Sequence, residues 1–436
     1  MNIIGYLTSN IFKQPSIFLG LVAMVGLILQ KKSIGDIVKG TFKTIIGVII
    51  LFQGVNLVST SVTPLSNAFS TLYQVSDTNI FDPNSWLNVL GEYGSVVGIV
   101  LVLSFIINLI VARFTPIKNI FLTGHVFFWM SYLMVGTGVQ IGLKGTGLTI
   151  FATTFLALYI ILVPALLRPA VSRITKNDMF TIGHTAGIYC LLGTFIGKFI
   201  GNKEKSTENL KIPKSLDFFR DTTIATSLIM FIIYITVGLI IGSEKSAEIY
   251  GVSVGTINTI GGMQYDLFTF SLMAGLTFGA GLTILLTGVR LMLGEIVPAF
   301  KGISDKLIPN AIPALDIPMI FPYAPNALLI GFVLSMVSSI LTIVILVSTG
   351  TLSYAVIPLT VACFFDIAPG AIFANAEGGR TAAIVTSILG GIIMVLLLTC
   401  SLALFKETVA GFHQLYSGND NSIWSIIAYY IGKLFA

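Results

Sequence analysis

Hydrophobic residues are grouped into long runs along this chain, and short polar stretches separate the runs. The clearest runs carry few charges and cover residues 17–30, 45–62, 96–112, 148–167, 223–241, 268–293, 327–347 and 382–404. A helix needs about 20 predominantly apolar residues to cross a ~30 Å hydrocarbon core. Together with four interrupted segments, the pattern predicts an all-α polytopic membrane protein with about 10–11 transmembrane helices.

The interrupted segments are apolar but have polar centres beside glycine or proline. They are residues 117–142 with His125, 177–200 with His184, 308–325 with Asp316, and 358–380 with Asp366, Asn375 and Glu377. Irregular backbone at membrane depth is tolerated where it is buried in protein or lines a cavity. We therefore expect re-entrant hairpins or broken helices here. Basic residues flank 177–200 on both sides, which predicts a hairpin with His184 near its tip and a surface helix over 203–221.

Composition agrees with a membrane location and excludes several functions. Hydrophobic residues make up 55% of the chain and charged residues 10%, against about 25% charged in soluble domains. The net charge of +5 fits basic cytoplasmic loops and gives no reason to expect nucleic acid. Three cysteines lie in apolar runs without metal-ligand spacing, so we expect no metal and no cofactor. No Walker A loop or nucleophilic triad is present, which argues against ATP-driven pumping by this chain alone.

An internal repeat relates two of the apolar runs. Residues 47–69 and 281–303 share seven of 23 positions without gaps, including Gly54 with Gly288 and Pro64 with Pro298. Two such halves are typical of secondary-transporter folds, which bind substrate at the interface between the repeats. The sequence thus predicts two repeats, most simply inverted ones.

The polar groups inside these segments are the candidates for function, because ionisable groups in a membrane are costly. His125 and His184 each follow a glycine and serve either as hydrogen-bonding groups for a polar ligand or as buried imidazoles that satisfy backbone carbonyls. Asp316 lies in a proline-rich stretch; it could accept hydroxyl hydrogen bonds or a proton, cap a helix, or pair with Arg290. Arg290 and Glu295, on the repeated run, have the character of structural residues.

A second group of candidates is less distinctive. Asn375 and Glu377 precede Gly378-Gly379, where backbone can approach a ligand closely, although Glu377 could simply pair with Arg380. Tyr93 and Ser95 stand at the mouth of the run 96–112 and could equally cap a loop. Many neutral hydrogen-bonding groups with few charges suit a sugar-like ligand.

Several stretches carry a family resemblance over nearly the whole chain, in collinear order. They are KGTFKTIIGVIILFQG at 39–54, LTGH at 122–125, IGH at 182–184, GKFIGNKEKSTENLKIPKSL at 197–216, AFKGISDKLIPN at 299–310, ALDIPMIFPYAPNA at 314–327, and the segment 373–382. At these motifs the chain resembles the EIIC permease of the ascorbate branch of the bacterial phosphotransferase system (PTS).

This resemblance implies group translocation in a bacterial plasma (inner) membrane. The permease binds the sugar acid outside, exposes it to the cytoplasm, and a phosphorylated EIIB partner, which works with EIIA, transfers a phosphoryl group to it. The implied fold is a homodimer in which a V-motif scaffold holds a mobile core that moves like an elevator. Mapped here, residues 1–85 and 222–310 are expected to be scaffold, and 86–221 and 311–436 core.

The resemblance assigns substrate binding to the two motif histidines, to Asp316, and to the stretch with Tyr323 and Asn326. Thr185 joins them because it follows His184 where ascorbate-type members have glutamine nearby. The usual FANHFGG reads FANAEGG here, which loses a histidine and adds Glu377. An added carboxylate and missing amides disfavour an acidic lactone and point to a neutral sugar or polyol. Two rival functions stay open: an ion- or proton-coupled transporter using Asp316, Asp366 or Glu377, and a passive channel or structural membrane protein.

Overall fold

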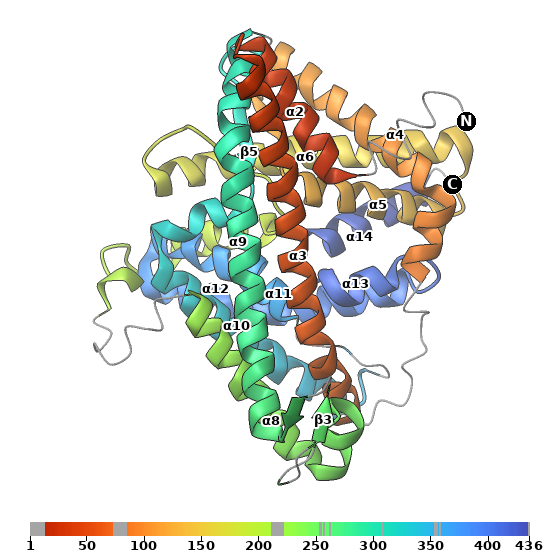
Figure 1. The fold of residues 1–436 in the computed structure, drawn as a ribbon, viewed down its shortest axis with the longest axis vertical. Coiled ribbons are helices and arrows are strands. Elements are labelled where there is room, and N and C mark those ends of the chain that lie inside the picture. The colour runs from red at the N-terminus through yellow and green to blue at the C-terminus, as the bar shows by residue number, and fades with distance from the viewer. Residues whose placement is uncertain are drawn as a thin grey trace.

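The computed structural model describes residues 14–72, 85–210, 222–252, 255, 258–260, 263–306, 308–352, 356 and 359–434 (Figure 1). The α-helices are α2 (Pro15–Leu29), α3 (Ile34–Leu72), α4 (Ser85–Phe114), α5 (Gly124–Gln140), α6 (Gly145–Thr175), α7 (Gly187–Phe199), α8 (Thr222–Tyr250), α9 (Leu267–Lys306), α10 (Pro325–Ser348), α11 (Thr360–Ala362), α12 (Ala368–Leu404), α13 (Ala410–Tyr416) and α14 (Asp420–Gly432). Shorter elements are the strands β1 (Asn119–Phe121), β2 (Thr181–Ile182), β3 (Asn258–Ile260), β4 (Met263–Tyr265) and β5 (Ile312–Leu315), the 3-10 helices η2 (Thr207–Asn209) and η4 (Ile317–Tyr323), and the π-helix η5 (Cys363–Ile367).

The predicted all-α polytopic architecture is confirmed. Within the described residues, seven helices are long and apolar enough to cross a membrane: 34–58, 92–114, 145–175, 226–250, 267–285, 325–348 and 363–404. This is fewer than the 10–11 expected, because α2, α5 and α7 have only 15, 17 and 13 residues. Helices of that length fall short of the ~30 Å hydrocarbon core.

The surface helix expected over 203–221 is absent in its described part. Residues 203–210 form irregular backbone with the single 3-10 turn η2, and residues 211–221 lie outside the described residues. Helix α8 extends beyond its apolar run to Tyr250, with a kink at Gly242, whose φ is 84°.

The helices α3 and α9, which contain the two copies of the sequence repeat, pack against each other along much of their length and run in opposite directions (Figure 1). Near one end Lys43 Nζ of α3 lies 2.9 Å from Glu295 Oε1 of α9, so Glu295 has a structural role in connecting the two helices. Near the middle Gly54 faces the backbone of Gly281 and Leu285. Small residues at such crossings let membrane helices approach closely.

A three-stranded parallel sheet in the order β1-β5-β2, which the hydrophobic pattern did not predict, lies inside the helical protein. Asn119 is opposite Ile312 in β5, and Thr181 of β2 is opposite Ala314. Open sheet edges are costly inside a membrane, and here the Asn108 side chain bonds backbone groups of the edge strand β1. Asn108 bonds the backbone of Asn119 and Phe121 at 2.9 and 3.0 Å, and Thr181 donates to the Pro164 carbonyl.

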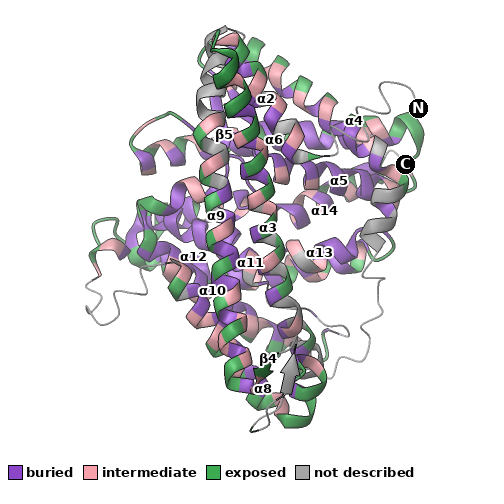
Figure 2. Cartoon of the chain, in the orientation of Figure 1, coloured by how far each residue is buried: buried purple, intermediate pink, exposed green. Residues whose placement is uncertain are grey.

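Buried positions concentrate around this sheet and along α5, α12 and α14, whereas exposed positions follow the outer helices (Figure 2). Many of the exposed residues are large and apolar, among them Ile110, Leu166, Leu341 and Ile345. An apolar exterior around a core that contains polar groups is the arrangement expected of a protein solvated by lipid.

Candidate functional site

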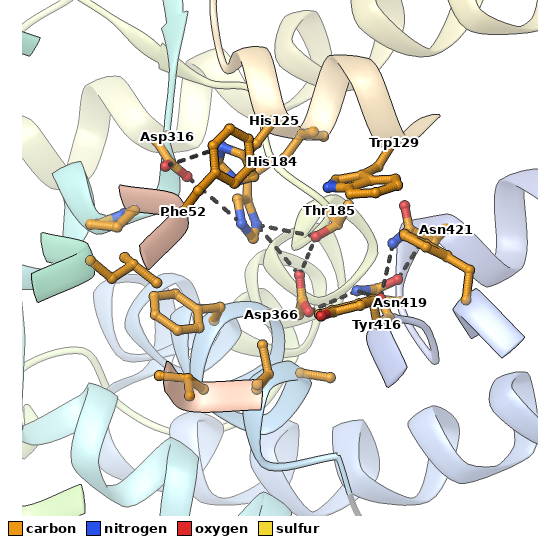
Figure 3. Close-up of a pocket in the computed structure, with 18 residues that line it drawn as sticks. Phe52, His125, Trp129, His184, Thr185, Asp316, Asp366, Tyr416, Asn419 and Asn421 are labelled. Atoms are coloured by element: carbon orange, nitrogen blue, oxygen red, sulfur yellow. Dashed lines mark hydrogen bonds and ion pairs between the residues drawn. The ribbon is translucent and has the colours of Figure 1, made fainter. Parts of the chain in front are cut away.

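The sheet explains how three distant motifs reach one site. His125 follows β1 in the first turn of α5, His184 is the second residue after β2, and Asp316 directly follows β5. Because the strands are parallel, their carboxyl ends meet at the same edge, and the three side chains converge there (Figure 3). Thr185 lies beside His184 in the same turn.

Asp316 lies between the two imidazoles at distances longer than a hydrogen bond. His184 Nε2 is 3.7 Å from Asp316 Oδ1, and His125 Nδ1 is 4.0 Å from Asp316 Oδ2. The ring centroids of the histidines are 6.1 Å apart. Hydrogen bonds between such groups need about 2.5–3.2 Å, so these polar atoms keep capacity for a ligand hydroxyl that bridges them.

Asp316 also caps η4, because its Oδ1 accepts a 2.8 Å hydrogen bond from the Ile317 N–H. Asp316 therefore caps a helix with one carboxylate oxygen and can still accept a hydrogen bond from a ligand with the other. Its second carboxylate oxygen faces the histidine side of the cavity (Figure 3).

A second carboxylate, Asp366, approaches His184 from the opposite side. Asp366 Oδ1 is 3.4 Å from His184 Nδ1 and accepts a 2.6 Å hydrogen bond from the Thr185 hydroxyl, while Asn419 Nδ2 donates to Oδ2 at 2.8 Å. Asp366 lies in the π-helix η5. Single π-turns are frequent at functional sites because they re-aim side chains that an α-helix would point elsewhere.

These groups line a cavity of about 150 Å³. One water molecule needs roughly 10–15 Å³ of such cavity volume, so the cavity has room for a ligand of monosaccharide size. Trp129, Phe412 and Tyr416 supply an aromatic wall, and the rings of Trp129 and Phe412 are 5.1 Å apart. Phe52 and Val58 of α3 and Leu285 of α9 supply an apolar wall on another side.

The start of α14 holds the turn that carries His184. Asp420 accepts hydrogen bonds from Gly187 N at 3.0 Å and Ile188 N at 2.7 Å, which caps α7, and Tyr159 donates to it at 3.1 Å. The Asp420 N–H donates to the Thr185 carbonyl at 3.1 Å. Sequence reasoning missed Asn419 and Asp420; their only signal was a polar stretch between two apolar helices.

Several predicted site residues lie away from the cavity. Asn375 Oδ1 accepts from Thr207 N at 2.8 Å, and Asn326 Nδ2 donates to the Thr207 carbonyl at 3.1 Å. Both asparagines thus hold the segment around η2 against α10 and α12. Tyr323 is 43% exposed and does not line the cavity.

The remaining two candidates lie on α4. Tyr93 is partly buried and packs against the core, outside the cavity lining. The side chain of Ser95 lies outside the described residues.

Glu377 does not pair with Arg380, as one interpretation of the sequence held. Its Oε1 accepts a 2.6 Å hydrogen bond from Arg173 Nε on α6, while the Arg380 N–H donates to the Lys205 carbonyl. Helix α12 is kinked just after it, at Gly379 with φ 66°. The structure therefore places this carboxylate in a bond between helices rather than in the cavity.

Replacing Glu377 by Gln is expected to leave ligand affinity unchanged within about twofold and to lower stability by less than about 1 kcal/mol, because the pair with Arg173 is partly exposed. Ligand binding and thermal unfolding of the purified variant check this. A tenfold loss of affinity, on the order of 1.4 kcal/mol, would place Glu377 in the binding site after all.

His125, His184 and Asp316 each offer one ligand atom, and these atoms lie within 4.8 Å of one another. Two imidazoles and a carboxylate form a set that first-row transition metals accept. The same three groups have free hydrogen-bonding capacity for a hydroxyl, so the expectation that the site needs no metal stays a prediction.

With the fold and the cavity in place, comparison with known proteins is informative. The family described as the PTS system sugar-specific permease component (EIIC-GAT) matches residues 10–420. The chain belongs to this family, so it is a multi-pass membrane permease subunit for a sugar. The family implies EIIB and EIIA partners. It is also similar to a protein of Mycoplasma pneumoniae named ascorbate-specific PTS system EIIC component. That similarity is 27% identity over 450 aligned residues and covers 93% of this chain and 67% of the relative. Both findings confirm the resemblance drawn from the motifs.

Proposed function

We propose that the cavity at the carboxyl edge of the β1-β5-β2 sheet is the substrate site of a group-translocating permease. The observation that carries this proposal is the convergence of His125, His184 and Asp316, from three separate motifs, on one cavity with hydrogen-bonding capacity to spare. Their alternating donors and acceptors suit the hydroxyls of a sugar or a sugar acid. The Mycoplasma pneumoniae relative is named for ascorbate, so ascorbate is one of the compounds to be tested.

The walls of the cavity support an elevator-like movement. Among the described lining residues, helices α3 and α9 contribute the apolar side chains Phe52, Val58 and Leu285, and the polar groups come from other elements. An apolar face can slide past the polar site without breaking hydrogen bonds to it. We assign residues 1–85 and 222–310 to a dimer-forming V-motif scaffold and 86–221 and 311–436 to the mobile core.

In the proposed reaction the permease orients its ligand and the partner supplies the phosphoryl group. A substrate hydroxyl oxygen attacks phosphorus on phosphorylated EIIB, the bond from phosphorus to EIIB breaks, and the hydroxyl proton passes to a nearby base. His184 and Asp316 face the cavity and fit the role of orienting that hydroxyl. We also propose that the permease works as a homodimer in a bacterial plasma membrane.

An ion- or proton-coupled transporter is the second candidate, because one observation favours it. His184 lies between two buried carboxylates, Asp316 and Asp366, at 3.7 and 3.4 Å. Chains of acidic and histidine side chains in a membrane are typical of proton relays.

Uptake of labelled ascorbate and of labelled hexitols into membrane vesicles separates the two functions. The proposed function predicts rapid uptake only when phosphorylated EIIB is inside the vesicle, and no effect of a protonophore. Vesicles without EIIB, or with EIIB that was never phosphorylated, serve as controls. Uptake that ignores EIIB and collapses with the protonophore would contradict the proposed function and support the proton-coupled alternative.

A further inference from the structure

Asp366 is the one acidic group in the cavity that the motifs did not assign. Its carboxylate reaches the cavity from η5 and is held by Thr185 and Asn419, as Figure 3 shows. Hydrogen bonds at 2.6 and 2.8 Å hold the carboxylate at the cavity wall.

The charges around the ligand space are unevenly distributed. Two carboxylates, Asp316 and Asp366, and two histidines line the cavity, and among the described lining residues there is no lysine or arginine. With both carboxylates ionised and one of the two histidines protonated, these four groups carry a net charge of −1 (two negative charges and one positive). A third carboxylate, Asp420, lies just behind His184 and occupies the N–H groups at the start of α7. The N-terminus of α7, which would otherwise attract an anion, is therefore already used.

Two oxygen atoms in the cavity favour a ligand that donates hydrogen bonds. Asp316 Oδ2 faces the cavity at 4.0 Å from its neighbour His125, and Asn421 Oδ1 is buried without a hydrogen-bond partner in the described part of the chain. Both are acceptors. A neutral polyhydroxy compound offers a donor to each of them, whereas an ionised acid group accepts only.

The aromatic wall fits the same ligand. Trp129 and Phe412 both line the cavity, with their ring centroids 5.1 Å apart. The C–H groups of a sugar or sugar alcohol pack on such rings while its hydroxyls turn toward the acceptors.

We propose that Asp366 is a specificity-determining residue which, together with Asp316, makes the site prefer a neutral sugar or sugar alcohol to an anionic sugar acid. This inference rests on the proposed function and names the substrate class of the same site. Sequence reasoning expected an added carboxylate to disfavour an acid, but attributed it to Glu377, which pairs with Arg173 instead.

The test is equilibrium binding to the purified full chain by calorimetry or thermal shift. The probes are two monoanions, ascorbate and gluconate, and a neutral panel of xylitol, sorbitol, other pentitols and hexitols, and hexoses. For the wild type we expect at least one neutral compound to bind about tenfold or more tightly than either monoanion. Asp366→Asn keeps an oxygen and an amide in place and removes the charge. It is expected to shift the ratio of anion affinity to neutral affinity by about tenfold toward the anion.

Asp178→Asn is the matched control. This carboxylate pairs with Arg168 outside the cavity and its side chain is 50% exposed, so the affinity ratio is expected to stay at the wild-type value. Tighter binding of ascorbate or gluconate than of every neutral compound by the wild type would overturn the inference while leaving the proposed function in place. An unchanged ratio in Asp366→Asn would overturn it as well. If Asp366→Asn does not fold, the wild-type preference alone decides. Absence of saturable binding by any probe would instead contradict the proposed function, and this inference with it.

Discussion

Replacing Asp316 by Asn is expected to weaken binding of the transported compound by on the order of 100-fold. The variant keeps the oxygen that caps Ile317, so η4 and β5 should retain their geometry. It loses the charged acceptor that faces both His125 and His184. A hydrogen bond to a charged group contributes about 1.5–3 kcal/mol, and one bridging hydroxyl uses this group most directly. Equilibrium binding of whichever compound binds the wild type most tightly gives the result.

The control for Asp316→Asn is the Glu377→Gln variant, which also removes one carboxylate charge but outside the cavity. Equal affinities in the Asp316→Asn variant and the wild type would show that the ligand binds elsewhere. If Asp316→Asn and Glu377→Gln lost thermal stability to the same extent and both kept the wild-type ligand affinity, Asp316 would have a role in the fold alone.

Gly54→Ala is expected to lower the stability of the protein strongly. A Cβ at this position would overlap the backbone nitrogen of Leu285 and lie 2.6 Å from the Gly281 carbonyl oxygen. Backbone atoms cannot move aside as a flexible side chain does, so α3 and α9 would have to separate. Overpacking of this kind costs about 1–3 kcal/mol or more. Thermal unfolding and size-exclusion profiles in detergent measure it.

Gly147→Ala, on α6, is the matched control, because a Cβ there meets nothing within 4 Å. Alanine has a higher helix propensity than glycine by about 1 kcal/mol, so this variant should be as stable as the wild type or slightly more stable. Similar unfolding temperatures for the two variants would show that the close contact between α3 and α9 contributes little.

The membrane helices were accessible from sequence because their signal is strong and local. Each of the eight clearest apolar runs falls on a single observed helix, the run 17–30 ending one residue beyond α2, and the polar centres near His125, His184 and Asp316 lie where regular helix is interrupted. The helix ends were harder to predict. The apolar run 223–241 stops before Gly242, whereas α8 continues across a kink there to Tyr250.

The sheet could not be predicted from the same pattern. Its strands have three, two and four residues, and the central strand, β5, contains Pro313, which lacks the N–H that a central strand normally uses. These strands form because distant segments pair, and no local periodicity records that pairing. The sequence therefore identified His125, His184 and Asp316 as candidates without showing what brings them together.

The rest of the site depends on contacts between positions far apart in the chain. Asp366 bonds Thr185 across 181 positions, and Glu377 bonds Arg173 across 204. Both acids stand near glycine or proline in apolar surroundings, so the sequence alone gave no reason to assign one to the cavity and the other to a bond between helices. Asn326 and Asn375 carried the same ambiguity, and both hold the η2 segment in the structure.

The proposed substrate site lies at the carboxyl edge of the β1-β5-β2 sheet. An experimental structure of the full chain with its tightest-binding compound would locate the ligand. We expect ligand density between His125, His184 and Asp316, with a hydroxyl within hydrogen-bond distance of the Asp316 carboxylate and the ring of Trp129 against the ligand. Ligand density beside Asn375 and Glu377, with the sheet-edge cavity filled only by water, would contradict it.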